Sequence, residues 1–230
     1  MTPDRANPHR VNKARAVLFD LDGTLIDSSQ GFATAINALL AEMNLPEVSL
    51  ERIREEVSMG ARALLKQYLP QYQEQDYQAL RQRFLAHFVP VVGEQFEPYP
   101  GVSQCMHWLH QAKIPWGIVT NKPFCLTEPT LARLDWQGRQ ALVCPDHVLQ
   151  AKPSGEGLLL ACQQLGLEPH QVAYLGDHQI DVLAAREAGC QAWATAWGLR
   201  PASEQPEHWQ ADAICPTSDQ LQSFLAERIA

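Results

Sequence analysis

Residues 16–24 read AVLFDLDGT, and this stretch decides the fold of the chain. The apolar run at 16–19 has the length and composition of a strand buried on both faces, and the Asp-Gly pair at 22–23 marks a turn directly after it. Asp20 and Asp22 therefore stand at the end of a buried strand. Because an unpaired carboxylate out of water costs several kcal/mol, we expect a cation beside them.

The rest of the chain divides into two kinds of pattern. Between the first strand and residue 97, apolar residues recur at helical spacing, with Ser49 as an expected N-cap, which indicates a helical insertion. From residue 97 onward, strand and helix candidates alternate, which predicts an α/β fold with a parallel sheet covered on both faces. The strands are expected at 116–120, 141–146, 172–177, 191–197 and 211–215, and the helices near 102–112, 124–135, 155–165, 179–188 and 218–228.

Composition narrows the class of protein. The formal net charge of −8 argues against binding to nucleic acid or to an anionic membrane surface. No apolar run approaches the roughly 18 residues of a membrane span, and residues 1–14, expected to form a flexible tail, contain no segment typical of a signal peptide. The six cysteines stand singly, so we expect reduced thiols in a cytoplasmic protein.

Polar residues follow several of the expected strands. Asp20 and Asp22 follow the first strand, and Asp177 and Asp181 lie in LGDHQID at 175–181. In a parallel sheet, functional groups gather beyond the carboxyl ends of the strands, so these acids are expected to meet in space. Their hard oxygen ligands suit Mg²⁺ better than a soft metal.

Three further residues are candidates for holding an anion. Thr120 offers a hydroxyl, Asn121 a backbone N–H at a strand-to-helix turn, and Lys152 a positive charge just before a helix. With Mg²⁺ they would neutralise the charge of a transferring phosphoryl group, where catalysis is mostly positioning and electrostatics.

The two acids at 20 and 22 are expected to have different roles. A carboxylate can attack phosphorus and form an aspartyl-phosphate, and Asp20, nearest the strand, is the expected nucleophile. Asp22 would protonate the leaving alcohol and later take a proton from the hydrolytic water. Gly23 allows the tight turn that brings the second carboxylate to the same side.

Four stretches of the chain resemble the ordered motifs of one enzyme family. DLDGT at 20–24, VTNK at 119–122, AKP at 151–153 and GDHQID at 176–181 are similar to those of the haloacid dehalogenase superfamily, in the phosphatase branch with a helical cap inserted after the first motif. The resemblance implies a Rossmann-like core at 15–29 and 98–230 and a cap at 30–97. It also implies that Asp20, Asp177 and the backbone carbonyl of Asp22 bind Mg²⁺, that Thr120 and Lys152 bind phosphate, and that Asp181 acts without touching the metal. His178 occupies a place where the family often has a second acid.

Other stretches resemble a narrower group. RIREEVSMGARALL at 52–65, ALVCPDHV at 141–148, LLLACQQLGL at 158–167 and EHWQADAI at 207–214 are similar to bacterial phosphoglycolate phosphatases, including those that act on N-acetylmuramic acid 6-phosphate. This resemblance implies substrate contacts from Ser58, Gly60 and Arg62. Arg62 would pair with a substrate carboxylate, which both compounds possess.

The sequence thus predicts a Mg²⁺-dependent phosphomonoesterase for a small, carboxylate-bearing phosphate ester, acting as a monomer or homodimer. Dehalogenation is disfavoured because a halide leaves without a proton and has little use for Asp22. A phosphomutase with the same core stays open. A non-enzymatic phospho-acceptor is a further alternative, although such a protein has little need of a large helical insertion.

Overall fold

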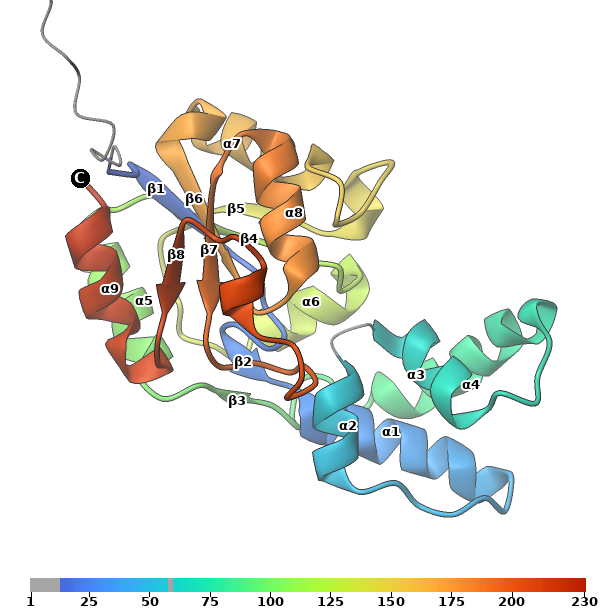
Figure 1. Ribbon diagram of the computed structural model, residues 1–230. Helices are drawn as coiled ribbons and strands as arrows, with labels where there is room; N and C mark the ends of the chain where they lie inside the picture. Colours follow the sequence, from blue (N-terminus) through green and yellow to red (C-terminus); the bar gives the residue numbers. More distant parts are fainter. Residues whose placement is uncertain (1–12, 58–59) are drawn as a thin grey trace, which may run out of the picture.

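The computed structural model describes residues 13–57 and 60–230, and its centre is a six-stranded parallel sheet (Figure 1). The strand order is β5-β4-β1-β6-β7-β8, and each neighbouring pair is parallel. The strands are β1 (Ala16–Phe19), β4 (Trp116–Val119), β5 (Arg139–Val143), β6 (Val172–Gly176), β7 (Gln191–Thr195) and β8 (Ala213–Cys215). Every residue of β1, β4 and β6 is buried, as expected of central strands with helices on both faces. The predicted α/β class is confirmed.

Helices cover both faces of this sheet (Figure 1). The apolar side chains of α5 (Val102–Gln111) and α9 (Leu221–Arg228) pack on one face, and those of α7 (Glu156–Leu165) and α8 (Gln179–Ala188) pack on the other. The helix predicted at 124–135 is shorter, because α6 spans Phe124–Leu131. Pro129 lies inside it and removes one backbone hydrogen bond, which weakens the last turn.

Four helices form a separate lobe with an apolar cluster of its own (Figure 1). They are α1 (Ser29–Glu42), α2 (Leu50–Glu56), α3 (Gly60–Tyr68) and α4 (Tyr77–Phe88). All four lie within the range 30–97 expected for the insertion, except that α1 begins one residue earlier, at Ser29. Ser49 caps α2 as expected, since its side chain accepts a hydrogen bond from the backbone N–H of Arg52. Leu126 and Leu199 of the sheet domain belong to the same cluster, so the lobe is seated on segments that follow β4 and β7.

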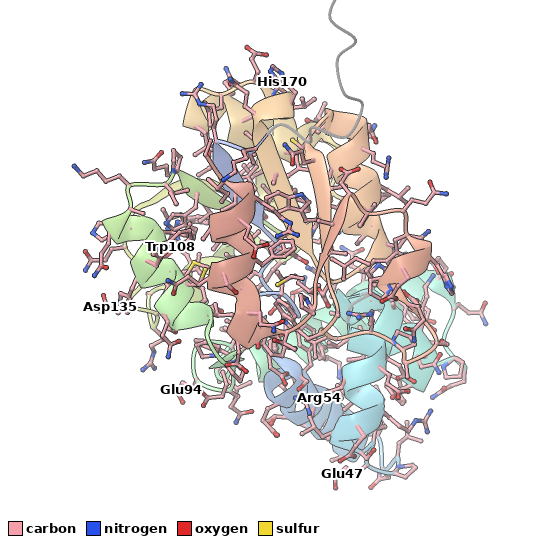
Figure 2. All side chains as sticks on the ribbon, turned by 60° about the vertical axis from the view of Figure 1, so that its left-hand side comes forward. Glu47, Arg54, Glu94, Trp108, Asp135 and His170 are labelled. Carbon is pink, nitrogen blue, oxygen red and sulfur yellow. The ribbon has the colours of Figure 1, made fainter. Side chains whose placement is uncertain are left out.

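A short antiparallel ribbon connects the lobe to the sheet domain. It consists of β2 (Ile26–Asp27) and β3 (Glu97–Pro98). The carboxylate of Asp27 accepts a hydrogen bond from the backbone N–H of Ser29 at 3.0 Å and pairs with Arg54. Arg54 belongs to the lobe helix α2 and is labelled in Figure 2. This ion pair ties the lobe to its own connection with the sheet domain.

The folded domain begins before the end of the tail predicted at 1–14. Ala14 is buried, its N–H donates to the carbonyl of Arg228 at 2.9 Å, and its carbonyl accepts from Ala230 at 2.8 Å. The prediction is therefore wrong at this residue, because hydrogen bonds to the C-terminal segment fix it. All six cysteines are free thiols. In the described ranges there is no helix of the length and apolar character that crossing a membrane requires.

Candidate active site

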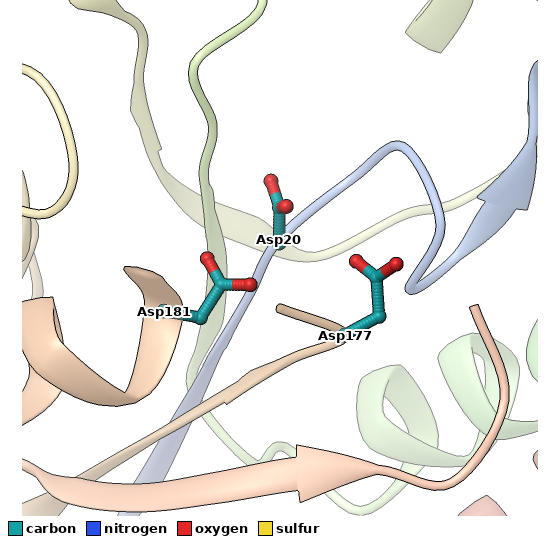
Figure 3. Close-up of side chains that lie close together, drawn as sticks. All are labelled: Asp20, Asp177 and Asp181. Atoms are coloured by element: carbon teal, nitrogen blue, oxygen red, sulfur yellow. The ribbon is translucent and has the colours of Figure 1, made fainter. Parts of the chain in front are cut away.

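Three carboxylates from distant parts of the sequence meet at the carboxyl ends of β1 and β6 (Figure 3). Asp20 follows β1, Asp177 follows β6, and Asp181 lies in the first turn of α8. Each contributes an oxygen, and these oxygens all lie within 4.8 Å of one another. They meet because β1 and β6 are hydrogen-bonded neighbours in the sheet. Three of the four acids that were expected to meet therefore do so, and the Asp22 carboxylate is not part of this cluster.

The buried surroundings of the cluster disfavour the ionised form of its carboxyl groups. Burial, reinforced by the charges of Asp181 and Asp20, raises the pKa of Asp177 to about 8. Burial likewise raises the pKa of Asp20 to about 6, although Lys152 opposes the change. A divalent cation between these acids would remove this repulsion.

Lys152 supplies the positive charge nearest the cluster. Its side chain is buried, and its ammonium nitrogen lies 2.9 Å from Oδ1 of Asp20 and 2.7 Å from Oδ1 of Asp181. The ammonium also donates to the hydroxyl of Tyr174 at 2.9 Å. Burial alone would lower the pKa of Lys152, but Asp181 and Asp20 raise it above its usual range. The ammonium therefore stays charged.

Thr120 and Asn121 lie where β4 ends, but their side chains have different partners. Thr120 is buried, and its hydroxyl accepts a hydrogen bond from the backbone N–H of Lys122 at 3.2 Å. The Asn121 amide donates to the backbone carbonyl of Lys152 at 3.1 Å and accepts from its N–H at 3.0 Å. The side chain of Asn121 thus fixes the segment that carries Lys152. Its expected contact with substrate through the backbone stays a prediction.

The residues around Asp177 fit a hard divalent cation. Its carboxylate accepts hydrogen bonds from the hydroxyl of Thr24 at 3.1 Å and from the backbone N–H of Leu199 at 2.9 Å. Gly23 has a φ of +87°, and a Cβ at this position would overlap the Asp177 carboxylate. Only glycine lets the backbone approach the acid so closely.

Two of the three acids remain available for a metal. The carboxylate of Asp181 is occupied by Lys152, by the hydroxyl of Tyr174 at 3.2 Å and by the backbone N–H of His178 at 3.0 Å. These contacts agree with the expectation that Asp181 does not touch the metal. Asp20 and Asp177 are then the carboxylates that would hold Mg²⁺, and oxygen donors suit that ion.

His178 acts as the cap of α8. Its ring nitrogen Nδ1 accepts a hydrogen bond from the backbone N–H of Ile180 at 3.4 Å, while Asp181 bonds back to the N–H of His178. Nε2 of His178 lies 3.3 Å from the carboxylate of Glu204. The residue therefore stabilises the turn between Asp177 and Asp181.

Asp22 has a partner that the sequence pattern does not indicate. Both of its carboxylate oxygens accept hydrogen bonds from the ammonium of Lys122, at 3.0 and 3.2 Å. The carboxylate thus faces Lys122, and the expected metal contact through its backbone carbonyl stays a prediction. The one feature of the sequence that points to this ion pair is the lysine of the VTNK stretch at 119–122. Its pairing with an acid 100 residues away depends on the strand order, which the sequence does not state.

The residues expected to contact substrate from the lobe are only partly described. Ser58 lies outside the described residues. Gly60 begins α3 with a φ of +79°. Arg62 is exposed and pairs with Glu74, which also lies 2.8 Å from Lys66. Arg62 is thus bound to another residue of the lobe in this structure, and its contact with substrate stays a prediction.

Comparison with known proteins assigns the chain to a family. The model of the haloacid dehalogenase-like hydrolases matches residues 17–195, a range that includes Asp20, Asp22, Thr120, Lys152 and Asp177. The chain belongs to this family. The predicted resemblance is confirmed.

Relatives that match this haloacid dehalogenase-like hydrolase over most of its length are named phosphatases. It is 39% identical to the N-acetylmuramic acid 6-phosphate phosphatase of Pseudomonas aeruginosa over 204 residues, which are 88% of this chain and 90% of that protein. It is 40% identical to the phosphoglycolate phosphatase of Xanthomonas campestris over 208 residues, 90% of this chain and 94% of that protein. The hydrolase is therefore an enzyme of the phosphatase branch.

Solved structures show the same fold. A "predicted phosphoglycolate phosphatase" from Haemophilus somnus superimposes on this hydrolase with a TM-score of 0.82 at 24% identity, covering 92% of this chain and 97% of that one. A hydrolase of the same family from Deinococcus radiodurans, solved with bound phosphate and sodium, gives a TM-score of 0.70 at 24% identity over 94% of this chain and 96% of that one.

Proposed function

We propose that this enzyme hydrolyses a small, carboxylate-bearing phosphate monoester through a phosphoryl group carried on Asp20. The observation that supports this most directly is the asymmetry of the Asp20 carboxylate. Oδ1 accepts a hydrogen bond from the backbone N–H of Leu21 at 2.8 Å and lies 2.9 Å from the ammonium of Lys152. Among the residues that the structure describes, Oδ2 has no hydrogen-bond partner. One oxygen is therefore fixed and the other is free to attack.

In the first half of the reaction, the free oxygen of Asp20 attacks phosphorus and the bond from phosphorus to the alcohol oxygen breaks. The electron pair of that bond stays on the leaving oxygen, which takes a proton from the carboxyl of Asp22. Because the pKa of Asp20 is about 6, this acid is ionised and nucleophilic near neutral pH. The ammonium of Lys152 and the hydroxyl of Thr120 stabilise charge on the phosphoryl oxygens.

In the second half, water attacks the phosphorus of the aspartyl-phosphate. The carboxylate of Asp22 takes a proton from this water, and the bond from phosphorus to Asp20 breaks. Inorganic phosphate leaves, and both acids return to their starting protonation states.

The proposed cofactor is Mg²⁺, held by the carboxylates of Asp20 and Asp177 and by the backbone carbonyl of Asp22. When bound, it would supply positive charge for the phosphoryl oxygens and remove the repulsion between the nucleophile and the anionic substrate. Hydrogen bonds from Thr24 and Leu199 fix the orientation of the Asp177 carboxylate, which supports its proposed role as a metal ligand.

The proposed substrates are phosphoglycolate and N-acetylmuramic acid 6-phosphate. Relatives named for each of them match this chain over most of its length at similar identity. The helical lobe would act as the cap that encloses the ester, and Arg62 would leave Glu74 to pair with the substrate carboxylate.

The test measures release of inorganic phosphate from both esters at equal concentration. N-acetylglucosamine 6-phosphate is the matched control, because it lacks the lactyl carboxylate of the muramic compound. We expect preference for one carboxylate-bearing ester, loss of all turnover in Asp20→Asn, and a raised KM in Arg62→Ala for carboxylate-bearing esters only. Unchanged turnover in Asp20→Asn would contradict the mechanism, and equal hydrolysis of the control ester would contradict the substrate class.

A further inference from the structure

Lys122 is a buried cation to which the proposed mechanism gives no role. It follows β4 within the segment Thr120–Asn121–Lys122, and only 7% of the residue is exposed. A lysine is rarely buried to this extent unless its charge has a partner. The partner here is the Asp22 carboxylate, which accepts two hydrogen bonds from the one ammonium.

The other side of the Lys122 ammonium faces the helical lobe. Two phenyl rings lie near it, that of Phe88 at 5.4 Å and that of Phe32 at 6.0 Å from ring centroid to nitrogen. These rings come from α4 and α1, and their centroids are 4.6 Å apart. The faces of aromatic rings attract a cation and exclude water from it. The lobe therefore completes the environment of the ammonium.

This arrangement restricts the orientation of Asp22. Because both carboxylate oxygens bond to the same ammonium, rotation of the carboxylate would break two hydrogen bonds. Removal of water by Phe32 and Phe88 strengthens the electrostatic attraction within the pair. A carboxylate that acts as a base must lie within hydrogen-bond reach of the attacking water, so a small misplacement of Asp22 would slow the second half of the reaction substantially.

We propose that Lys122 is a positioning residue that fixes Asp22 for proton transfer and links this orientation to the seating of the lobe through Phe32 and Phe88. This inference rests on the proposed function, because it assumes that Asp22 is the acid and base of an aspartyl-phosphate mechanism. It predicts that loss of Lys122 impairs proton transfer without preventing attack by Asp20.

The test uses leaving groups that differ in their need for a proton. The p-nitrophenolate ion leaves without protonation, whereas the alkoxide of glycolate does not. Rapid-mixing measurements compare p-nitrophenyl phosphate with phosphoglycolate in the wild-type protein, Asp22→Asn and Lys122→Met. Methionine keeps the length and apolar stem of lysine and removes its charge.

In Lys122→Met we expect kcat for phosphoglycolate to fall about 100-fold, the lower end of the range for loss of general acid–base catalysis, with KM changed less than about threefold. With p-nitrophenyl phosphate, we expect a burst of about one p-nitrophenolate per enzyme followed by slow turnover, because only the second half of the reaction needs the base. The double variant with Asp22→Asn should be no slower than Asp22→Asn alone, since both changes affect one function.

The outcomes separate the inference from the function on which it rests. If Asp22→Asn gives no burst, the aspartyl-phosphate proposal is wrong. If Asp22→Asn gives a burst but Lys122→Met keeps wild-type turnover, or loses activity toward both esters equally without a burst, only the role of Lys122 is wrong. If the effects of the two substitutions multiply in the double variant, Lys122 acts independently of Asp22, which also overturns the inference.

The link to the lobe is tested with two phenylalanines of its core. Phe88→Leu removes a ring from Lys122, whereas Phe84→Leu changes a neighbouring buried ring at 5.4 Å from Phe88 that is not paired with the lysine. We expect Phe88→Leu to lower kcat for phosphoglycolate about fivefold more than for p-nitrophenyl phosphate, consistent with loss of a desolvated cation–π contact. If Phe88→Leu and Phe84→Leu change the ratio of kcat for phosphoglycolate to kcat for p-nitrophenyl phosphate equally, the proposed link between the lobe and Asp22 is wrong.

Discussion

The ammonium nitrogen of Lys152 lies 2.9 Å from a carboxylate oxygen of Asp20, the proposed nucleophile. The same ammonium lies 2.7 Å from Asp181, which is almost entirely buried. Lys152 therefore holds one oxygen of the nucleophile while Asp181 fixes the lysine from the other side. In the proposed mechanism, this single buried cation would both orient the attacking acid and supply charge for the phosphoryl group.

Lys152→Met should reduce kcat at least 100-fold, because it removes both the anchor of Asp20 and charge stabilisation in the transition state. It should also lower the free energy of unfolding of the metal-free protein by about 3 kcal/mol, since it leaves buried carboxylates without their partner. Urea unfolding and steady-state kinetics measure both effects. Lys66→Met, at an exposed lysine of the lobe, is the control and should change neither substantially. Activity near that of the wild-type protein in Lys152→Met would contradict the assigned role.

Gly23→Ala should weaken the binding of Mg²⁺. The added Cβ would overlap the Asp177 carboxylate, and the φ of +87° is unfavourable for alanine. Gly166→Ala is the matched control, because Gly166 has a φ of +66° but, among the residues that the structure describes, no atom beyond its chain neighbours lies within 4 Å of the added Cβ. Both variants should lose about 1 kcal/mol of stability from backbone strain, whereas only Gly23→Ala should weaken Mg²⁺ binding at least tenfold. Isothermal titration measures the affinity, and equal affinities in the two variants would disprove the close-approach argument.

Asn121→Ala should lower kcat about tenfold by releasing the segment that presents Lys152. The change removes two hydrogen bonds to the backbone of that lysine. Asn37→Ala provides a matched control, because the Asn37 amide makes the same pair of hydrogen bonds to the backbone of Val48 in the lobe, both at 2.9 Å. Both variants should lose a similar amount of stability, but only Asn121→Ala should lose turnover. A comparable loss of kcat in Asn37→Ala would show that the loss comes from destabilisation of the protein and not from release of the segment that carries Lys152.

The raised pKa values of the acid cluster predict how stability depends on pH. In the metal-free folded protein the pKa of Asp177 is about 8 and that of Asp20 about 6, both above the ordinary 3.8. The folded state therefore keeps protons that the unfolded chain has lost, so these groups make the protein less stable as pH rises from about 4 to 8. Binding of the proposed Mg²⁺ would displace these protons, so its stabilising effect should be larger at pH 8.5 than at pH 5.

Thermal unfolding with and without Mg²⁺ at the two pH values measures this dependence. Asp177→Asn is the control, because it removes the carboxyl with the higher pKa, and it should lose most of both the pH dependence and the Mg²⁺ effect. An equal increase in Tm at pH 5 and pH 8.5 in the wild-type protein would contradict the assignment of these acids to the metal.

The sequence predicts the site residues that directly follow a strand. Asp20, Thr120 and Asp177 each follow a buried apolar run, and parallel strands bring such ends to one edge of the sheet. The convergence of Asp20 and Asp177 was therefore expected without coordinates.

Contacts that depend on side-chain direction were not predictable in the same way. The pairing of Lys122 with Asp22 requires that β1 and β4 be neighbours, and the sequence does not give strand order. The pairing of Arg62 with Glu74 depends on how α3 packs beside the turn at Glu74–Asp76. The sequence places Ala14 in the tail because its hydrogen bonds to the C-terminal segment leave no local signal in the sequence.

The most direct test of the mechanism is to trap the phosphorylated enzyme. The protein is mixed with Mg²⁺ and phosphoglycolate, quenched in acid during turnover, digested and examined by mass spectrometry. We predict one phosphoryl group on the peptide that contains Asp20, more of it in Asp22→Asn treated with p-nitrophenyl phosphate, and none in Asp20→Asn. A phosphoryl group on a different residue, or phosphate release by Asp20→Asn at the wild-type rate, would contradict the account.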